Sequence, residues 1–206
     1  MNRALIASTA AVAVAALLGG TWYLTQASGD ALAACRTSSV AGGAIGGPFE
    51  LVNGAGETVT DADVITAPTL VYFGYTFCPD VCPLDAARNG EAVALLEERG
   101  HEVNSVFITI DPERDTPEMV GDYASYMHER MVGLSGSLEQ VKAASKAYKT
   151  YFKKQKPEEG NEEYYLVDHS TFTYLMFPEN QFAEFYRRDV TAEKLADSVQ
   201  CFIENS

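Results

Sequence analysis

The chain has 206 residues with 15 basic and 29 acidic side chains, and its formal net charge is −14. Hydrophobic residues make up 47% of it and charged residues 21%, which excludes a disordered or collagen-like chain and indicates a packed core. The composition also disfavours a nucleic-acid partner, because acids outnumber bases almost two to one, no basic run stands out and phosphate binding requires clustered lysine and arginine. The four cysteines are too few for a disulfide scaffold, so their positions matter more than their number.

The first 24 residues predict a membrane anchor. Residues 4–24 carry no charge, and a helix of that length spans about 31 Å, close to the hydrocarbon thickness of about 30 Å. Trp22 and Tyr23 suit the membrane interface, and Arg3 favours a cytoplasmic N-terminus. We therefore expect a single N-terminal transmembrane helix with everything after it on the extracytoplasmic, periplasmic side.

Two other fates of the N-terminus stay open. A cleaved signal peptide is one, because residues 31–33 offer a small-residue cleavage pattern. Processing as a lipoprotein is the other, with Cys35 as the lipidated residue. We favour the retained anchor because its apolar run is longer than the usual signal-peptide core of about 7 to 15 residues. Mass spectrometry of the membrane-extracted protein distinguishes the three.

A flexible tether is predicted next, followed by one domain at residues 48–206. Residues 25–47 are small and polar, contain five glycines and show no periodicity. The domain opens with a predicted β-hairpin within residues 49–66, around the turn sequence NGAG.

The remaining pattern alternates strands and helices. The expected strands are residues 69–75, 105–110, 131–134, 164–177 and 181–186; the expected helices are 84–99, 116–130, 137–154 and 191–203. A polar loop at residues 155–163 precedes the last two strands. A parallel βαβ unit followed by an antiparallel hairpin and a C-terminal helix predicts an α/β, thioredoxin-like fold.

Cys78 and Cys82 lie where the first buried strand ends and the first long helix begins, in the sequence CPDVCP. A helix N-terminus stabilises a thiolate, so we expect a pKa below the free value of about 8.5. On a regular helix the Cβ atoms of residues i and i+4 lie about 5 to 6 Å apart, which is wide for a disulfide but suits two thiolates on one metal ion. Pro79 and Pro83 allow a distorted turn, so a disulfide form also stays open.

Among the three histidines, His169 is the best third ligand. It lies in the sequence LVDHST after the polar loop, whereas His101 and His128 have the surroundings of surface residues. Two sulfurs and one imidazole suit Cu(I) and also accept Cu(II), whereas a closed zinc site requires a fourth ligand. Asp168 is the candidate for orienting His169. The plainer alternative is that the two cysteines are buried core thiols and His169 an ordinary strand residue.

Three separated motifs carry a resemblance to a known family. They are YFGYTFCPDVCP at residues 72–83, DPERDTP at 111–117 and VDHS at 167–170. In this order they resemble the Sco/SenC family of copper chaperones over residues 49–203. The resemblance implies a membrane-anchored thioredoxin-like domain that binds one copper ion through Cys78, Cys82 and His169.

The family resemblance also implies a role and partners. The role is assembly of the dinuclear copper centre of cytochrome c oxidase, by delivering copper, by reducing the cysteines of that centre, or both. The expected partners are the copper-centre subunit of the oxidase and other copper chaperones. The DPERDTP segment is expected to be structural or to face a partner.

Cys35 and Cys201 lie outside the copper motif. An even pair left over in an oxidising compartment predicts a disulfide that fastens the tether to the last helix, with lipidation of Cys35 as the competing interpretation.

The competing functions are an exported thiol-disulfide reductase, which uses Cys78 or Cys82 as the attacking thiolate, and a copper or redox sensor. A peroxidase is disfavoured, because Tyr75 stands where such enzymes place threonine or serine.

Overall fold

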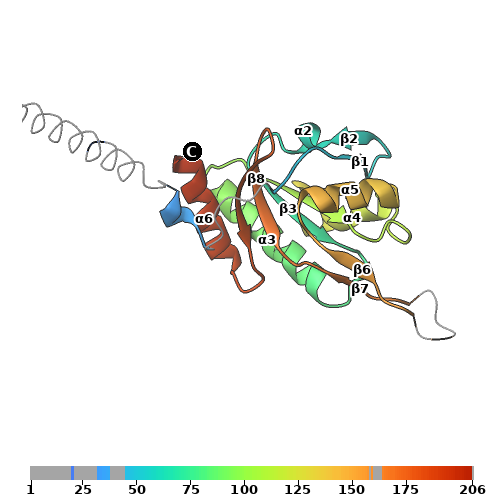
Figure 1. The fold of residues 1–206 in the computed structure, drawn as a ribbon. Coiled ribbons are helices and arrows are strands. Elements are labelled where there is room, and N and C mark those ends of the chain that lie inside the picture. Colours follow the sequence, from blue (N-terminus) through green and yellow to red (C-terminus); the bar gives the residue numbers. More distant parts are fainter. Residues whose placement is uncertain (1–19, 21–31, 38–44, 158, 160–163, 206) are drawn as a thin grey trace, which may run out of the picture.

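The computed structural model describes residues 20, 32–37, 45–157, 159 and 164–205 (Figure 1). The predicted anchor, Gly20 apart, lies outside the described residues. Within the part that is described, no helix has the length and apolar character needed to cross a membrane. The anchor and its orientation therefore stay predictions.

In the described part of the chain, seven strands form one mixed sheet in the order β2-β1-β5-β4-β3-β8-β9. Their bounds are Glu50–Asn53 (β1), Thr58–Thr60 (β2), Thr69–Gly74 (β3), Asn104–Thr109 (β4), Met131–Ser135 (β5), Thr173–Phe177 (β8) and Gln181–Tyr186 (β9). The central strands β3, β4 and β5 are parallel, and β1 and β8 add antiparallel strands on either side of them. This arrangement confirms the predicted α/β class, the N-terminal hairpin and the C-terminal hairpin.

Helices cover both faces of the sheet. Their bounds are Asp61–Val64 (α2), Val81–Glu98 (α3), Pro117–Met127 (α4), Leu138–Ala147 (α5) and Ala192–Asn205 (α6). Phe107 of β4 contacts Tyr123 of α4, with ring centroids 4.9 Å apart, on the face that also carries α3 and α6. On the opposite face Phe73 contacts Tyr148 at the end of α5, with centroids 5.3 Å apart. Since alternate residues of a strand point to opposite faces, the fully buried β3 supplies both cores.

Two helix predictions need correction. The helix expected at residues 84–99 begins at Val81, so it contains Cys82 but not Cys78. The helix expected at 137–154 ends at Ala147, and Lys149 then adopts a left-handed conformation with φ of 55°. Helical hydrogen bonding cannot continue through that conformation. The chain instead forms a strand, β6 (Phe152–Lys154).

The strand predicted at residues 164–177 is two strands. Its first part, β7 (Val167–His169), pairs antiparallel with β6 and places Phe152 opposite His169. Its second part is β8 of the main sheet. The β6–β7 ribbon extends from the body of the domain in Figure 1. The sequence thus predicted a strand here but not that it leaves the main sheet, which is what brings His169 to the cysteines.

Residues 32–37, inside the predicted tether, pack against the last helix. A 3-10 helix, η1 (Ala33–Cys35), places Cys35 in a disulfide with Cys201 of α6. Ser198 of α6 also donates a hydrogen bond to the Cys35 carbonyl oxygen at 2.6 Å. The predicted disulfide is confirmed, and it leaves Cys35 without the free thiol that lipidation requires.

Candidate metal centre

The two free cysteines lie at the carboxyl end of the central strand β3. Cys78 belongs to the loop between β3 and α3, where its N–H donates to the Tyr75 carbonyl oxygen at 3.3 Å. Cys82 lies in the first turn of α3, and its backbone N–H donates to Cys78 Sγ at 3.3 Å. The helix N-terminus therefore holds the sulfur of a residue outside the helix, where the helix dipole favours negative charge.

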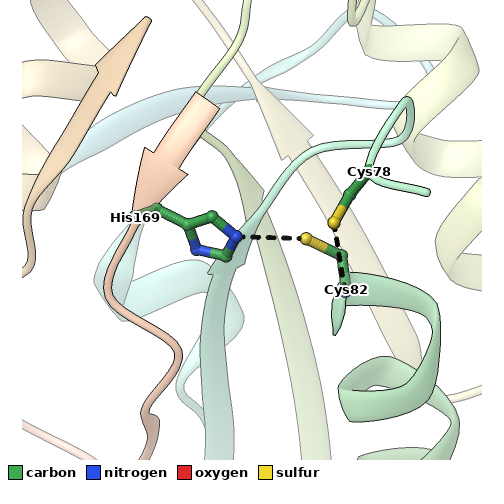
Figure 2. Close-up of side chains that lie close together, drawn as sticks. All are labelled: Cys78, Cys82 and His169. Carbon is green, nitrogen blue, oxygen red and sulfur yellow. Dashed lines mark hydrogen bonds between the residues drawn. The ribbon is translucent and has the colours of Figure 1, made fainter. Parts of the chain in front are cut away.

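His169 completes the group from the opposite side (Figure 2). Its Nε2 lies 3.4 Å from Cys82 Sγ, and its Nδ1 lies 2.8 Å from the carbonyl oxygen of Ser170. A carbonyl cannot donate a hydrogen, so Nδ1 carries the proton and the Nε2 lone pair faces the sulfurs. This is the tautomer that a metal ion requires at Nε2.

The ligand atoms of Cys78, Cys82 and His169 all lie within 4.8 Å of one another. The group contains two sulfurs and one imidazole, and the described residues add no fourth histidine, cysteine or carboxylate to it. Both cysteines are buried and His169 is partly buried. The donor set suits copper, above all Cu(I), and falls one ligand short of a closed zinc site.

The two thiols differ in acidity. The pKa of Cys78 is lowered to about 3, first because the Cys82 thiol donates a hydrogen bond to it and then because of the backbone N–H groups of Asp80 and Cys82. The pKa of Cys82 is raised, because it donates that hydrogen bond and is buried. The metal-free site is therefore a thiolate beside a thiol, and binding by both sulfurs releases one proton.

Two tyrosines pack against the histidine ring. Tyr75 meets it edge to face with centroids 5.8 Å apart, and its hydroxyl accepts the backbone N–H of Val167 at 3.3 Å. Tyr72 also lies edge-on to His169 and donates to the carboxylate of Asp85 at 2.9 Å. Burial raises the pKa of Tyr72. Tyr75 therefore fixes β7, the strand that presents His169, to the loop that presents Cys78.

Two buried aspartates of the DPERDTP segment, residues 111–117, accept hydrogen bonds from the segments that carry the metal ligands. The carboxylate of Asp115 accepts the backbone N–H of Thr76 at 2.9 Å and the Thr109 hydroxyl at 2.6 Å. The carboxylate of Asp111 accepts the hydroxyl of Tyr165, two residues before β7, at 2.7 Å. Both aspartates are buried. The DPERDTP segment is structural, as expected. It also fixes the loop that carries Cys78 and the residues that lead into β7, a role that its residues as the start of a helix did not indicate.

The positioning role predicted for Asp168 falls instead to the Ser170 carbonyl. Asp168 is exposed, and its carboxylate accepts the side-chain amide of Gln155 at 2.6 Å across the ribbon. The other two histidines lie apart from the metal group, as expected: His101 and His128 each lie 3.7 Å from a glutamate carboxylate. Successive side chains of a strand point to opposite faces, so a residue adjacent to His169 in β7 cannot face the same way.

A thioredoxin-like sheet with a Cys–Cys–His group at the end of its central strand defines a metal-binding member of that fold class. Comparison with known proteins identifies the family. The chain belongs to the SCO1/SenC family, whose profile matches residues 37–204.

The chain is similar to curated relatives and to solved structures. It is 50% identical to Protein SenC of Rhodobacter capsulatus over 204 residues, covering 98% of this chain and 91% of that protein. It is 40% identical to Protein SCO1 homolog 1, mitochondrial, of Arabidopsis thaliana, over 76% of this chain and 46% of that protein. The crystal structure of Arabidopsis thaliana ScoI with copper bound matches with a TM-score of 0.73 and 39% identity, covering 78% of this chain and 99% of the other.

Proposed function

We propose that the protein is a copper chaperone for assembly of the dinuclear copper centre of cytochrome c oxidase. The observation that carries the proposal is the convergence of Cys78 and Cys82, from the β3–α3 junction, and His169, from β7, to within 4.8 Å. Membership of the SCO1/SenC family and similarity to a structure with copper bound support it. The cargo is one copper ion per chain, held by two sulfurs and one imidazole nitrogen.

The geometry suits a carrier better than a permanent metal site. Three protein ligands leave the ion open to an incoming ligand from an acceptor, and soft thiolates of the acceptor compete well for Cu(I). His169 is held by the short β6–β7 ribbon, whereas both cysteines are held by the body of the domain. The expected acceptor is the copper-centre subunit of the oxidase, and other copper chaperones are the expected donors.

Anchoring at the membrane, with the domain on the periplasmic side, is part of the proposal. The apolar run at residues 4–24 and Arg3 before it support the anchor. The Cys35–Cys201 disulfide supports an oxidising compartment, because such bonds persist in the periplasm and are reduced in the cytosol. Membrane fractionation followed by mass spectrometry of the intact N-terminus tests both.

Thiol-disulfide reduction of the acceptor is the second candidate, favoured by the low pKa of Cys78. The Cys78 thiolate attacks one sulfur of a disulfide in the acceptor and forms a mixed disulfide with it. Cys82 then attacks Cys78, the acceptor leaves with two thiols, and the Cys78–Cys82 pair is oxidised by two electrons.

Titration of the reduced protein with Cu(I) against a chromophoric chelator tests the copper function. The wild type is expected to bind one ion, Cys78→Ser and Cys82→Ser to lose high-affinity binding, and His169→Ala to lose at least about 100-fold in affinity. His101→Ala is the matched control, since His101 lies beside Glu204, apart from the metal group. If His169→Ala binds copper like His101→Ala, the ligand assignment is wrong. A reductase without a copper role keeps its activity in His169→Ala.

A further inference from the structure

Six of the seven lysines of this acidic chain fall between residues 142 and 156. Residues 138–157 contain these six and one acid, Glu139, which gives the segment a net charge of +5 in a chain of −14. The lysines are too scattered in the sequence to form a basic run. Segregation of one charge sign is nevertheless a signature of a surface that selects a charged partner.

The fold gathers these lysines on α5 and the adjoining ribbon. Lys142 and Lys146 are four residues apart and share one face of α5, Lys149 follows the helix, and Lys153 and Lys154 lie in β6. All of these side chains, and that of Lys156, are exposed. Lys154 pairs with Glu113 at 2.6 Å, whereas within the described residues the other five lysines form no ion pair.

Two hollows shape this surface. One, of about 250 Å³, lies between α5 and the ribbon and is lined in part by Leu138, Lys142 and Phe152. The other, of about 480 Å³, is lined in part by Lys142, Lys146 and Tyr151. Leu138 and Tyr151 are exposed apolar side chains among the cations. Aromatic and apolar anchors within a charged rim are the anatomy of a protein-docking surface.

The surface adjoins the metal centre. Phe152, which lines both hollows, is directly opposite His169 in the β6–β7 pairing. The surface also lies far from the point where the N-terminal segment joins the domain. In Figure 1, η1 and α6 are at one end of the molecule, and α5 and the ribbon are toward the other. A surface in this position is better placed to contact a protein that approaches the metal centre than to contact the membrane to which the chain is tethered.

We propose that this lysine surface, formed by Lys142, Lys146, Lys149, Lys153 and Lys154 around the two hollows, docks an acidic face of the protein that exchanges copper with the Cys78–Cys82–His169 site. The remainder of the chain is strongly acidic and repels such a partner, so the positive surface orients the encounter as well as attracting it. The identity of the partner as a copper acceptor rests on the proposed function, whereas the docking itself is measured independently of copper.

Association kinetics with a defined probe test the surface. The probe is the soluble copper-centre domain of the oxidase subunit from the same organism, and the variant is Lys142→Glu/Lys146→Glu. The matched control, Arg187→Glu/Lys194→Glu, makes the same change in net charge at exposed positions outside the surface. A Lys142→Gln/Lys146→Gln variant guards against a helix destabilised by glutamate. Copper stoichiometry and the thermal midpoint of each variant report that the fold is kept.

The association rate constant of the Lys142→Glu/Lys146→Glu variant is expected to fall about tenfold at a salt concentration of about 0.01 M, and the difference to shrink at about 1 M. The glutamine variant is expected to fall less, and the control to stay within about twofold of wild type. Equal slowing of test and control variants overturns the proposal, because net charge alone then explains it. Unchanged association of the test variant also overturns it.

Vesicles with and without anionic phosphatidylglycerol form the second arm. Loss of vesicle binding in the lysine variant with unchanged association to the domain overturns the proposal in favour of a lipid-facing surface. Failure of the proposed function has a different signature: the wild type then binds no copper, while the lysine variant still slows association with the domain.

Discussion

The carboxylate of Asp115 accepts the backbone N–H of Thr76 at 2.9 Å, which joins the loop after β4 to the loop that carries Cys78. Asp115 is buried, and it accepts the hydroxyls of Thr76 and Thr109 as well. The geometry of the metal centre therefore depends on a residue that touches none of the three ligands. Residues of this kind determine how closely the ligands are held before the metal arrives.

Replacing Asp115 with asparagine is expected to weaken copper binding by about 10- to 100-fold and to destabilise the fold by about 1 to 3 kcal/mol. The amide keeps one acceptor oxygen but presents N–H₂ to donors that need an acceptor. Asp122→Asn, at an exposed acid of α4, is the matched control. Chelator competition and urea unfolding measure the two effects, and a destabilised variant with wild-type copper affinity would show that Asp115 serves the fold alone.

The Cys78 thiolate predicts an unusual pH dependence of alkylation. Its pKa of about 3 keeps it ionised from pH 5 to pH 8, so its reaction with iodoacetamide in the reduced, metal-free protein should be nearly independent of pH. The buried thiol of Cys82, whose pKa is raised, should remain unmodified. Cys82→Ala removes the largest cause of the shift and should restore pH dependence at Cys78. A wild-type rate that rises tenfold per pH unit up to pH 8 would contradict this assignment.

Tyr75 is expected to act through His169. Tyr75→Phe leaves the ring against the imidazole but removes the hydroxyl that accepts the Val167 N–H. An unsatisfied buried N–H costs about 1 to 3 kcal/mol, which loosens β7. We expect copper affinity to fall about tenfold. Tyr164→Phe, which changes an exposed tyrosine beside the same ribbon, is the control, and equal behaviour of the two variants would refute the role.

The disulfide is expected to stabilise the domain without contributing to the metal centre. Cys35→Ser/Cys201→Ser should lower the free energy of unfolding by about 2 to 4 kcal/mol and leave copper stoichiometry at one per chain. Thermal unfolding of the variant, and of the wild type with and without reductant, measures the effect. Copper loss in the double variant at a temperature where it is fully folded would mean that the two sites are coupled.

The ligands could be predicted from sequence because their chemistry is local. Cys78 and Cys82 stand at a strand-to-helix junction, which a buried strand pattern and two prolines mark clearly. His169 was found by elimination among three histidines. The expectation that Cys78 and Cys82 occupy positions i and i+4 of one regular helix is wrong, because Cys78 precedes α3.

What the sequence could not show depends on contacts between distant segments. Lys149 follows α5 in a left-handed conformation that residue preferences do not predict for lysine, and β6, the first strand of the ribbon that carries His169, begins at Phe152. Asp115 and Thr76 are 39 residues apart, and their hydrogen bonds become visible only in the fold. The lysine cluster is visible in the sequence, but its position beside His169 appears only in the fold.

Copper K-edge X-ray absorption of the reduced, copper-loaded protein tests the central claim most directly. The structure predicts a copper ion bound by two sulfurs and one imidazole nitrogen, with the imidazole scattering lost in His169→Ala and retained in His101→Ala. A wild-type spectrum without imidazole scattering, or one that His169→Ala leaves unchanged, would contradict the assignment of Cys78, Cys82 and His169 as the copper site.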